Sequence, residues 1–237
     1  MREAKSRSLP PMDRELKQSL CNYLEGFISE NRKARLNAVL SERTAHLRIV
    51  LENIYQAHNA SAVLRSCDCF GIQHVHFIEN RNNLKISDDV ALGSSNWLSI
   101  HRHREAGNNT VMALQELKQQ GYRIVATTPH EKSQPLSSLP VDKKLALVFG
   151  TEMHGISEEV WQTADEFVYI PMFGFTESFN ISVSAALCMH ELSTRIRSTV
   201  SDFRLSPDEK LDVYYNWLCQ SIGQSEGIIK SFLNDKK

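Results

Sequence analysis

The sequence predicts an α/β domain with a largely parallel sheet and helical extensions at both ends of the chain. Between about residues 47 and 197, short apolar runs alternate with stretches of helical spacing, which is typical of strands joined by helical crossovers. Outside this region, apolar residues recur at helical spacing without such runs. Five apolar runs are predicted as strands: Leu47–Glu52, His74–Ile78, Arg123–Thr127, Leu145–Phe149 and Glu166–Ile170.

Helices are predicted between these strands, at about residues 60–70, 107–120, 157–164 and 180–198. Gly71 and Gly121 follow the first two helices, in the position where a left-handed backbone commonly ends a helix. The polar segment 80–104 is predicted to be mostly loop.

Helical stripes also flank the α/β region. Leu16, Leu20 and Leu24 belong to one stripe, and Leu211 and Leu218 belong to another near the opposite end of the sequence. We therefore divide the chain into three segments: an N-terminal helical extension (1–44), an α/β domain (45–198) and a C-terminal helical extension (199–237).

Composition excludes several classes of protein. With 237 residues, of which 41% are hydrophobic, the chain is not expected to be disordered as a whole. Lysine and arginine number 27 against 28 acidic residues, so bulk charge does not drive binding to a polyanion. No apolar run approaches the roughly 20 residues that span a bilayer, and no segment resembles a signal peptide. We therefore expect a cytosolic protein that makes no membrane contact.

The cysteines also point to the cytosol. Their number is odd and they include no CxxC pair, so neither a disulfide framework nor a cysteine zinc site is predicted. We expect reduced, semi-buried thiols at Cys21, Cys67, Cys69, Cys188 and Cys219.

Three polar segments follow predicted strands. In the first, His58–Arg65, either Asn59 or Ser61 is predicted to cap the helix that follows, and Arg65 lies on its polar side with Asp68 as a possible partner. A capped helix with an ordinary surface ion pair explains the same pattern.

The second polar segment is Phe149–Ser157, in which Gly150 and Gly155 enclose Glu152 and Ser157 caps a helix. Glycines at both ends of such a loop would let a ligand approach the backbone closely. An ordinary strand-to-helix turn with an exposed glutamate is the alternative.

The third polar segment, residues 170–186, is rich in aromatic and small hydroxyl residues, with Ser178 and Asn180 among its polar groups. It is suited to enclosing a flat ring, although a buried loop and a small-residue packing helix would look alike. Because the carboxyl ends of parallel strands meet at one sheet edge, we expect all three segments to converge there, where α/β proteins bind ligands.

In order and spacing, these segments resemble the three motifs of the SpoU/TrmH-type RNA 2'-O-ribose methyltransferases of the SPOUT superfamily. The resemblance rests on Asn59…Arg65, Gly150-Thr-Glu152…Gly155 and Pro171…Ser178-Phe-Asn180, and it covers about residues 44–197. Within the family, the chain is most similar to the branch that methylates the D-loop guanosine of tRNA.

The resemblance implies a six-stranded α/β-knot domain, whose C-terminal part is threaded through a loop as a trefoil knot. Knots are so rare that sequence patterns alone do not predict one. The resemblance further implies S-adenosylmethionine as cofactor, tRNA as substrate, and a homodimer formed through the knot helix at 181–196 and part of the first-motif helix.

Family roles carry over to individual positions of this sequence. Thr127, Gly150, Ile170, Met172 and Phe179 are assigned to the cofactor site. The catalytic assignment falls on Arg65, supported by Asn59, Glu152, Ser178 and Asn180. Candidate RNA contacts lie in the basic N-terminal helices and the cluster at 101–104: Arg32, Lys33, Arg35, Arg43, Arg102 and Arg104.

We interpret Arg65 as a phosphate clamp rather than a base. A guanidinium has a pKa above about 12 and scarcely releases a proton near neutrality. Our hypothesis is that Arg65 holds the phosphate beside the target ribose in a bidentate contact, and that this phosphate or a water ordered by it accepts the hydroxyl proton. Glu152 then orients Asn59 or Arg65.

Three alternatives are left open by the sequence. The same site could methylate ribosomal RNA, or the chain could be a noncatalytic RNA-binding knot protein, which the complete polar set disfavours. A metal enzyme is a third alternative, because His74 and His76, like His101 and His103, alternate as strand residues do. No carboxylate or cysteine stands at a supporting spacing, so we predict no metal.

Overall fold

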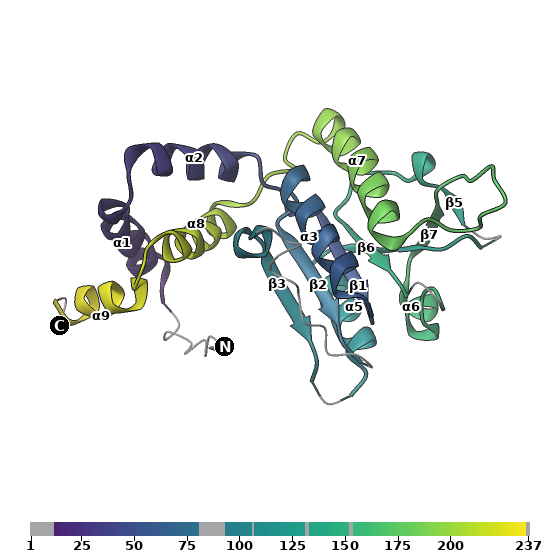
Figure 1. The fold of residues 1–237 in the computed structure, drawn as a ribbon, viewed down its shortest axis with the longest axis horizontal. Coiled ribbons are helices and arrows are strands. Elements are labelled where there is room, and N and C mark those ends of the chain that lie inside the picture. The colour runs from purple at the N-terminus through teal and green to yellow at the C-terminus, as the bar shows by residue number, and fades with distance from the viewer. Residues whose placement is uncertain (1–11, 81–92, 106, 131–132, 152–153, 236–237) are drawn as a thin grey trace. The chain divides into compact units, whose positions relative to one another are not determined.

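The computed structural model describes residues 12–80, 93–105, 107–130, 133–151 and 154–235 (Figure 1). Contacts divide the chain into two compact units. The larger unit, Glu42–Arg204, contains the sheet, and the smaller is formed by the chain before and after it.

The sheet has seven strands, all parallel, in the order β3-β2-β1-β6-β4-β7-β5. Its strands are β1 (Leu47–Glu52), β2 (His74–Ile78), β3 (Ser99–His103), β4 (Arg123–Thr127), β5 (Gln134–Pro135), β6 (Leu145–Phe149) and β7 (Glu166–Tyr169). Four of the five predicted strands are confirmed at their predicted bounds, and β7 ends one residue early. The implied number of six strands is wrong, because the two-residue strand β5 also pairs with β7.

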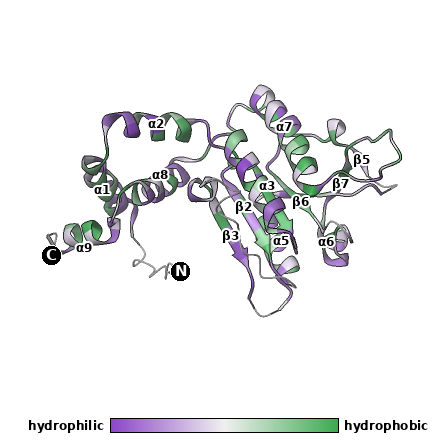
Figure 2. Ribbon diagram, viewed as in Figure 1, coloured by the Kyte–Doolittle hydropathy of each residue, from purple (hydrophilic) through white to green (hydrophobic). Residues whose placement is uncertain are grey.

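The prediction that 80–104 is mostly loop is wrong at its end, where β3 forms one edge of the sheet. An edge strand is half-buried, so it needs no continuous apolar run. Among its residues only Ile100 packs against the core, while His101 and His103 bond to histidines of β2. Figure 2 accordingly shows the polar colour along the arrow of β3.

Helices cover both faces of the sheet (Figure 1). Helices α3 (Ala57–Phe70) and α7 (Ile181–Thr199) pack together over one face, whose core includes Ile49 and Leu147. Helices α5 (Asn109–Gln119) and α6 (Glu158–Thr163) cover the other face, whose core includes Val50. Because both faces are buried, β6 is apolar throughout and β1 is apolar except at Arg48 and Glu52, which is why sequence patterns located these strands.

Most predicted helix ends are confirmed. Gly71 and Gly121 have positive φ angles of 74° and 85°, and the Ser157 side chain accepts the Val160 amide as the N-cap of α6. A side chain at Gly71 would also stand 2.8 Å from the Glu42 carbonyl oxygen.

The predicted cap of α3 is wrong. The helix begins at Ala57, and the N-cap position is occupied by Gln56. Asn59 lies inside the first turn, where its amide bonds to other side chains, and Ser61 donates to the Ala57 carbonyl. These bonds use the polar atoms that capping would require.

The smaller unit contains α1 (Arg14–Leu24), α2 (Glu30–Ser41), α8 (Pro207–Ser221) and α9 (Ser225–Asp235). Helix α1 packs against α8 and α9, and α2 packs against α8, so segments from opposite ends of the sequence share one core. Its buried residues include Leu20, Leu24 and Trp217.

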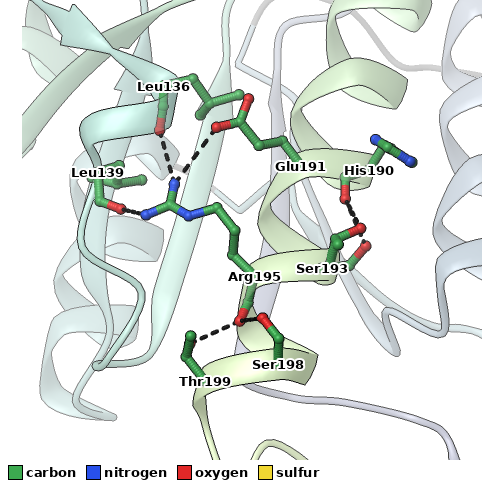
Figure 3. Close-up of polar contacts among 9 residues, drawn as sticks. Leu136, Leu139, His190, Glu191, Ser193, Arg195, Ser198 and Thr199 are labelled. Carbon is green, nitrogen blue, oxygen red and sulfur yellow. Dashed lines mark hydrogen bonds and ion pairs between the residues drawn. The ribbon is translucent and has the colours of Figure 1, made fainter.

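Helix α7 is fastened at its C-terminal half by Arg195 (Figure 3). The guanidinium donates to the carbonyl oxygens of Leu136 and Leu139, the first residue and the C-cap of a short 3-10 turn after β5, and it lies 3.6 Å from a Glu191 oxygen. Charge-assisted bonds of this kind are stronger than neutral ones. Helix α7 is thereby fixed to the segment that follows β5.

All five cysteines are free, as predicted, although three are fully buried rather than semi-buried. Burial raises the pKa of both Cys21 and Cys188 to about 12, so these thiols stay protonated near neutrality. None of the helices in the described part of the chain combines the length and apolar character needed to cross a bilayer.

Candidate active site

A cavity of about 590 Å³ lies at the carboxyl ends of β4, β6 and β7. Its volume falls within the roughly 300–1,000 Å³ typical of small-molecule sites. Walls contributed by Phe149, Val168 and Ile181 are apolar, and backbone groups of the loops that follow the strands supply polar atoms. The predicted site residues in its lining are Thr127, Gly150, Ile170, Met172, Ser178, Phe179 and Asn180.

The first and third polar segments meet through their amides. Asn180 caps α7 by accepting the Ser182 amide at 2.9 Å, and its Nδ2 donates to Asn59 Oδ1 at 3.2 Å. Asn59 in turn donates to Gln56 Oε1 at 3.0 Å and is only 2% exposed. Two residues from different loops are therefore fixed against each other beside the cavity.

The loop after β6 closes on itself. Thr151 N donates to the Gly155 carbonyl at 2.8 Å, and Gly155 N donates back to Thr151 at 3.0 Å. A side-chain carbon on Gly150 would lie 2.1 Å from the Gly155 carbonyl oxygen. The space that a side chain would take at Gly150 is thus filled by the backbone at Gly155, whereas the sequence analysis expected a ligand to approach the backbone there. The predicted Glu152 lies outside the described residues.

Arg65 does not line the cavity of the single chain. It follows Asn59 by six positions on α3, which turns it about 240° around the helix axis. Its side chain is exposed, and among the described residues it has no hydrogen-bond or ion-pair partner. The predicted pairing with Asp68 is wrong, because Asp68 pairs with Arg43 instead.

The ion pair with Asp68 also overturns the assignment of Arg43 to RNA binding. Arg43 is 1% exposed and cannot reach a phosphate backbone. Sequence alone did not reveal this, because Asp68 lies 25 positions away on another element.

The remaining basic candidates differ in their availability. Lys33 pairs with Glu25, and the guanidinium of Arg32 donates to Ser221 Oγ at 3.3 Å. Arg102 pairs with Glu79 at 2.8 Å. The most exposed candidates are Arg32, Arg35 and Arg104.

Four histidines of β2 and β3 form a ladder on the α5 side of the sheet. His74 Nδ1 lies 3.0 Å from His101 Nε2, and His76 Nδ1 lies 3.1 Å from His103 Nε2. The ring centroids of His76 and His101 are 4.4 Å apart and nearly parallel. Each short contact joins two ring nitrogens in a hydrogen bond. In the part of the chain that the structure describes, no three or more His, Cys, Asp or Glu side chains are grouped so that they could hold a metal ion.

Burial and neighbouring cations lower the pKa values of three of these imidazoles, those of His74, His76 and His101. Burial, then the charges of Arg48 and His101, lowers the pKa of His74 to about 3. Burial, then Arg48 and His103, lowers that of His101 to about 4. The pKa of His76 is also well below its usual value, mainly because of burial.

Gln56 was missed by the sequence analysis. It lines the cavity and fixes Asn59, and its position directly before a helix at the carboxyl edge of the sheet is the one signal that pointed to it. Ser184 and Cys188 of α7 also line the cavity, but they read as packing residues in the sequence.

This fold and cavity define an α/β protein that binds a small molecule at the carboxyl edge of a parallel sheet. The profile of the SpoU rRNA Methylase family matches residues 46–190, and the chain belongs to this family. The resemblance seen in the three motifs is thereby confirmed.

Two relatives extend the similarity over most of the chain. A tRNA (guanosine(18)-2'-O)-methyltransferase of Borreliella burgdorferi is 41% identical over 211 residues, which cover 88% of this chain and 95% of that protein. The Thermus thermophilus protein of the same name is 32% identical, covering 80% of this chain and 97% of that protein.

Solved structures are similar as well. The crystal structure of an A. aeolicus TrmH/SpoU tRNA modifying enzyme superposes with a TM-score of 0.73 at 29% identity, covering 82% of this chain and 98% of that one. The SpoU methyltransferase AviRb from Streptomyces viridochromogenes, solved with AdoMet, shares the fold at 20% identity, with a TM-score of 0.57 and coverage of 72% and 65%. Membership of this family implies the SPOUT knot.

Proposed function

We propose that this chain transfers a methyl group from S-adenosylmethionine to the ribose 2'-hydroxyl of guanosine 18 in the D-loop of tRNA. The observation that carries the proposal is the 41% identity to a methyltransferase of that name over 95% of its length. The family's own description mentions ribosomal RNA, which makes ribosomal RNA the second candidate substrate.

The cavity suits the proposed cofactor. Apolar walls beside backbone amides and carbonyls can take up a flat, polar-edged ring. Thr127, Gly150, Ile170, Met172 and Phe179 would hold S-adenosylmethionine, which supplies an electrophilic methyl group and its own leaving group. The protein's tasks are then to position the ribose and to remove one proton.

The protein's own groups divide these tasks. The bonds among Gln56, Asn59 and Asn180 fix the amides beside the cavity. Ser178, also in the cavity lining, would contact the ribose. Arg65 would grip the phosphate next to the target ribose, and its exposure supports that assignment. The phosphate, or a water that it orders, would accept the proton of the 2'-hydroxyl. Glu152 would orient Asn59 or Arg65.

We also propose a homodimer formed through α7 and part of α3. Val183 and Leu187 of α7 are 45% and 43% exposed, which is unusual for large apolar side chains on neighbouring turns. Such a dimer would let both protomers contribute to one site and would explain why Arg65 lies outside the cavity of a single chain. Sedimentation of wild type and of Leu187→Glu tests this, because the charge should dissociate the dimer.

The N-terminal helical extension at 1–44 is proposed to contact tRNA, with Arg32, Lys33 and Arg35 as the basic residues of α2, together with Arg102 and Arg104 on the α/β unit; no RNA contact is assigned to the C-terminal extension at 199–237. Neutralising the three α2 residues together should weaken tRNA binding and flatten its salt dependence. A cytosolic location fits the free cysteines and a tRNA substrate.

One assay tests the proposed reaction. The protein is incubated with methyl-labelled S-adenosylmethionine and with tRNA or ribosomal RNA, and the labelled nucleotide is mapped. Label at guanosine 18 of tRNA supports the proposal, and a tRNA already methylated at that ribose is the matched control that should take up none. Label in ribosomal RNA alone would establish the second candidate, and no transfer to either would leave a binding protein.

A further inference from the structure

A carboxylate outside the three motifs lies at the carboxyl end of β1. Glu52 is 1% exposed, and its oxygens accept from Thr110 Oγ1 at 2.6 Å, Ser157 Oγ at 2.7 Å and Ser157 N at 3.2 Å. A buried carboxylate is costly unless donors of this kind surround it. The burial of Glu52 therefore depends on the donors from Thr110 and Ser157.

The two hydroxyls that bond to Glu52 each have a defined hydrogen-bond acceptor and a defined donor. Thr110 in α5 gives its hydrogen to Glu52 and accepts from Asn80 Nδ2 at 2.8 Å. Ser157 gives its hydrogen to Glu52 and accepts the Val160 amide at 3.3 Å as the cap of α6. Each hydroxyl has a single hydrogen, so neither can rotate without losing a bond. Glu52 thus joins β1 to the first turns of two helices.

Ser157 is also the far anchor of the loop that follows β6. The near end of that loop is fixed where β6 pairs with β1 and β4. Between the anchors, Thr151 and Gly155 exchange two backbone hydrogen bonds, and both residues line the cavity. Because Gly150 is packed directly against Gly155, a shift of Ser157 would be passed to the cavity wall.

We propose that Glu52 is a positioning residue for the cofactor site: its carboxylate holds Ser157 and, through it, the hydrogen-bonded residues Gly155 and Thr151, which line the cavity. The proposal rests on the proposed function, in that S-adenosylmethionine is taken to occupy this cavity. A purely structural role would lower stability without changing cofactor affinity.

The first test replaces the donor and keeps the helix cap. Ser157→Asp retains a good N-cap residue but removes the hydroxyl and sets a second carboxylate beside Glu52. Calorimetric titration with S-adenosylmethionine should show at least about tenfold weaker binding. In steady-state kinetics the KM for the cofactor should rise with it, while kcat at saturation changes by less than about threefold. Ser29→Asp is the matched control, because Ser29 caps α2 in the other unit and its change should leave cofactor affinity unaltered.

The second test exchanges the hydrogen-bond donor and acceptor between positions 52 and 157. Combining Glu52→Gln with Ser157→Asp lets the new amide donate to the new carboxylate, so cofactor affinity should return to within about threefold of wild type. Capping alone predicts no such recovery, because the residue at 157 is the same in the single and double variants. If Ser157→Asp does not fold, Thr110→Val and Ser157→Ala each remove one arm and should weaken binding in the same direction.

The outcomes distinguish failure of the proposed function from failure of the proposed role of Glu52. Wild type that does not bind S-adenosylmethionine contradicts the proposed function. Wild type that binds it, together with Ser157→Asp of unchanged affinity or a double variant without recovery, overturns the role of Glu52 and leaves the proposed function standing.

Discussion

Two polar clusters of the α/β unit look alike in the sequence and differ in the structure. At the carboxyl ends of β4, β6 and β7, short amides and hydroxyls surround a cavity and bond across loops. On β2 and β3, histidines bond to one another through their ring nitrogens, and none of them lines that cavity. Polar residues therefore mark a binding site only when their partners leave space between them.

The largest expected effect is at Arg65, which has no hydrogen-bond or ion-pair partner in the part of the chain that the structure describes. Arg65→Lys should lower turnover on tRNA by at least about a hundredfold, because a lysine cannot reproduce a bidentate phosphate contact. Binding of S-adenosylmethionine, measured by calorimetry, should be unchanged. Arg14→Lys, at an exposed pair with Asp208, is the control. Substantial turnover by Arg65→Lys would contradict the clamp and favour a base at this position.

The second prediction concerns the loop that closes on itself. Gly150→Ala places a carbon against the Gly155 carbonyl, so the loop must shift, and stability should fall by about 1–3 kcal/mol. Cofactor affinity should fall about tenfold with it. Gly26→Ala meets nothing within 4 Å and should change stability by less than about 1 kcal/mol. Urea unfolding and calorimetry check both, and unchanged cofactor affinity in Gly150→Ala would separate the loop from the binding site.

The third prediction concerns the histidine ladder and pH. The folded pKa values of His74 and His101, about 3 and 4, lie below the unfolded value of 6.5. Protons therefore bind the unfolded chain preferentially, so this contribution to stability is fully present above pH 6.5 and is lost as pH falls through about 4 for His101 and about 3 for His74. Arg48 and Lys144, the cations nearest His74, oppose its protonation further.

At pH 5 the neutral His74 should account for about 2 kcal/mol of the stability lost relative to pH 7. Urea unfolding at both pH values should show that His74→Gln loses about 2 kcal/mol less unfolding free energy than wild type. The exposed His58 supplies the control, since His58→Gln should leave the loss as in wild type. If His74→Gln lost as much stability between pH 7 and pH 5 as wild type does, the histidine ladder would not be the source of that loss.

The smallest expected effect is at Gln56. Gln56→Ala removes one partner of Asn59, worth about 1 kcal/mol, and kcat/KM should fall about fivefold. Gln162→Ala removes a similar 3.0 Å bond on the exposed surface of α6 and should not change kcat/KM. Equal kinetics for the two variants would mean that Asn59 does not need Gln56.

The sequence analysis succeeded where burial is complete. The strands β1 and β6 are buried on both faces, so both coincide with mainly apolar runs. It failed at β3, because an edge strand carrying paired histidines has no such run. Motif positions were also located correctly, since Asn180 and Gly150 follow strand ends that any parallel sheet brings to one edge.

Long-range partners account for the other errors. Asn59 was assigned to a helix cap because its partner Asn180 lies 121 positions away. Arg43 was counted as a surface cation because nothing local marks its burial against Asp68. Glu52 attracted no notice, since a glutamate at the end of a strand is ordinary until its three donors are known.

The bond between Asn59 and Asn180 also sets when the site first exists. During synthesis, α3 leaves the ribosome long before the residue that completes its polar contacts, and the cap of α7 emerges with that same residue. A nascent chain that ends before Asn180 therefore has its first motif but no assembled centre. The contact between the first and third polar segments is therefore available only to molecules whose translation has passed residue 180.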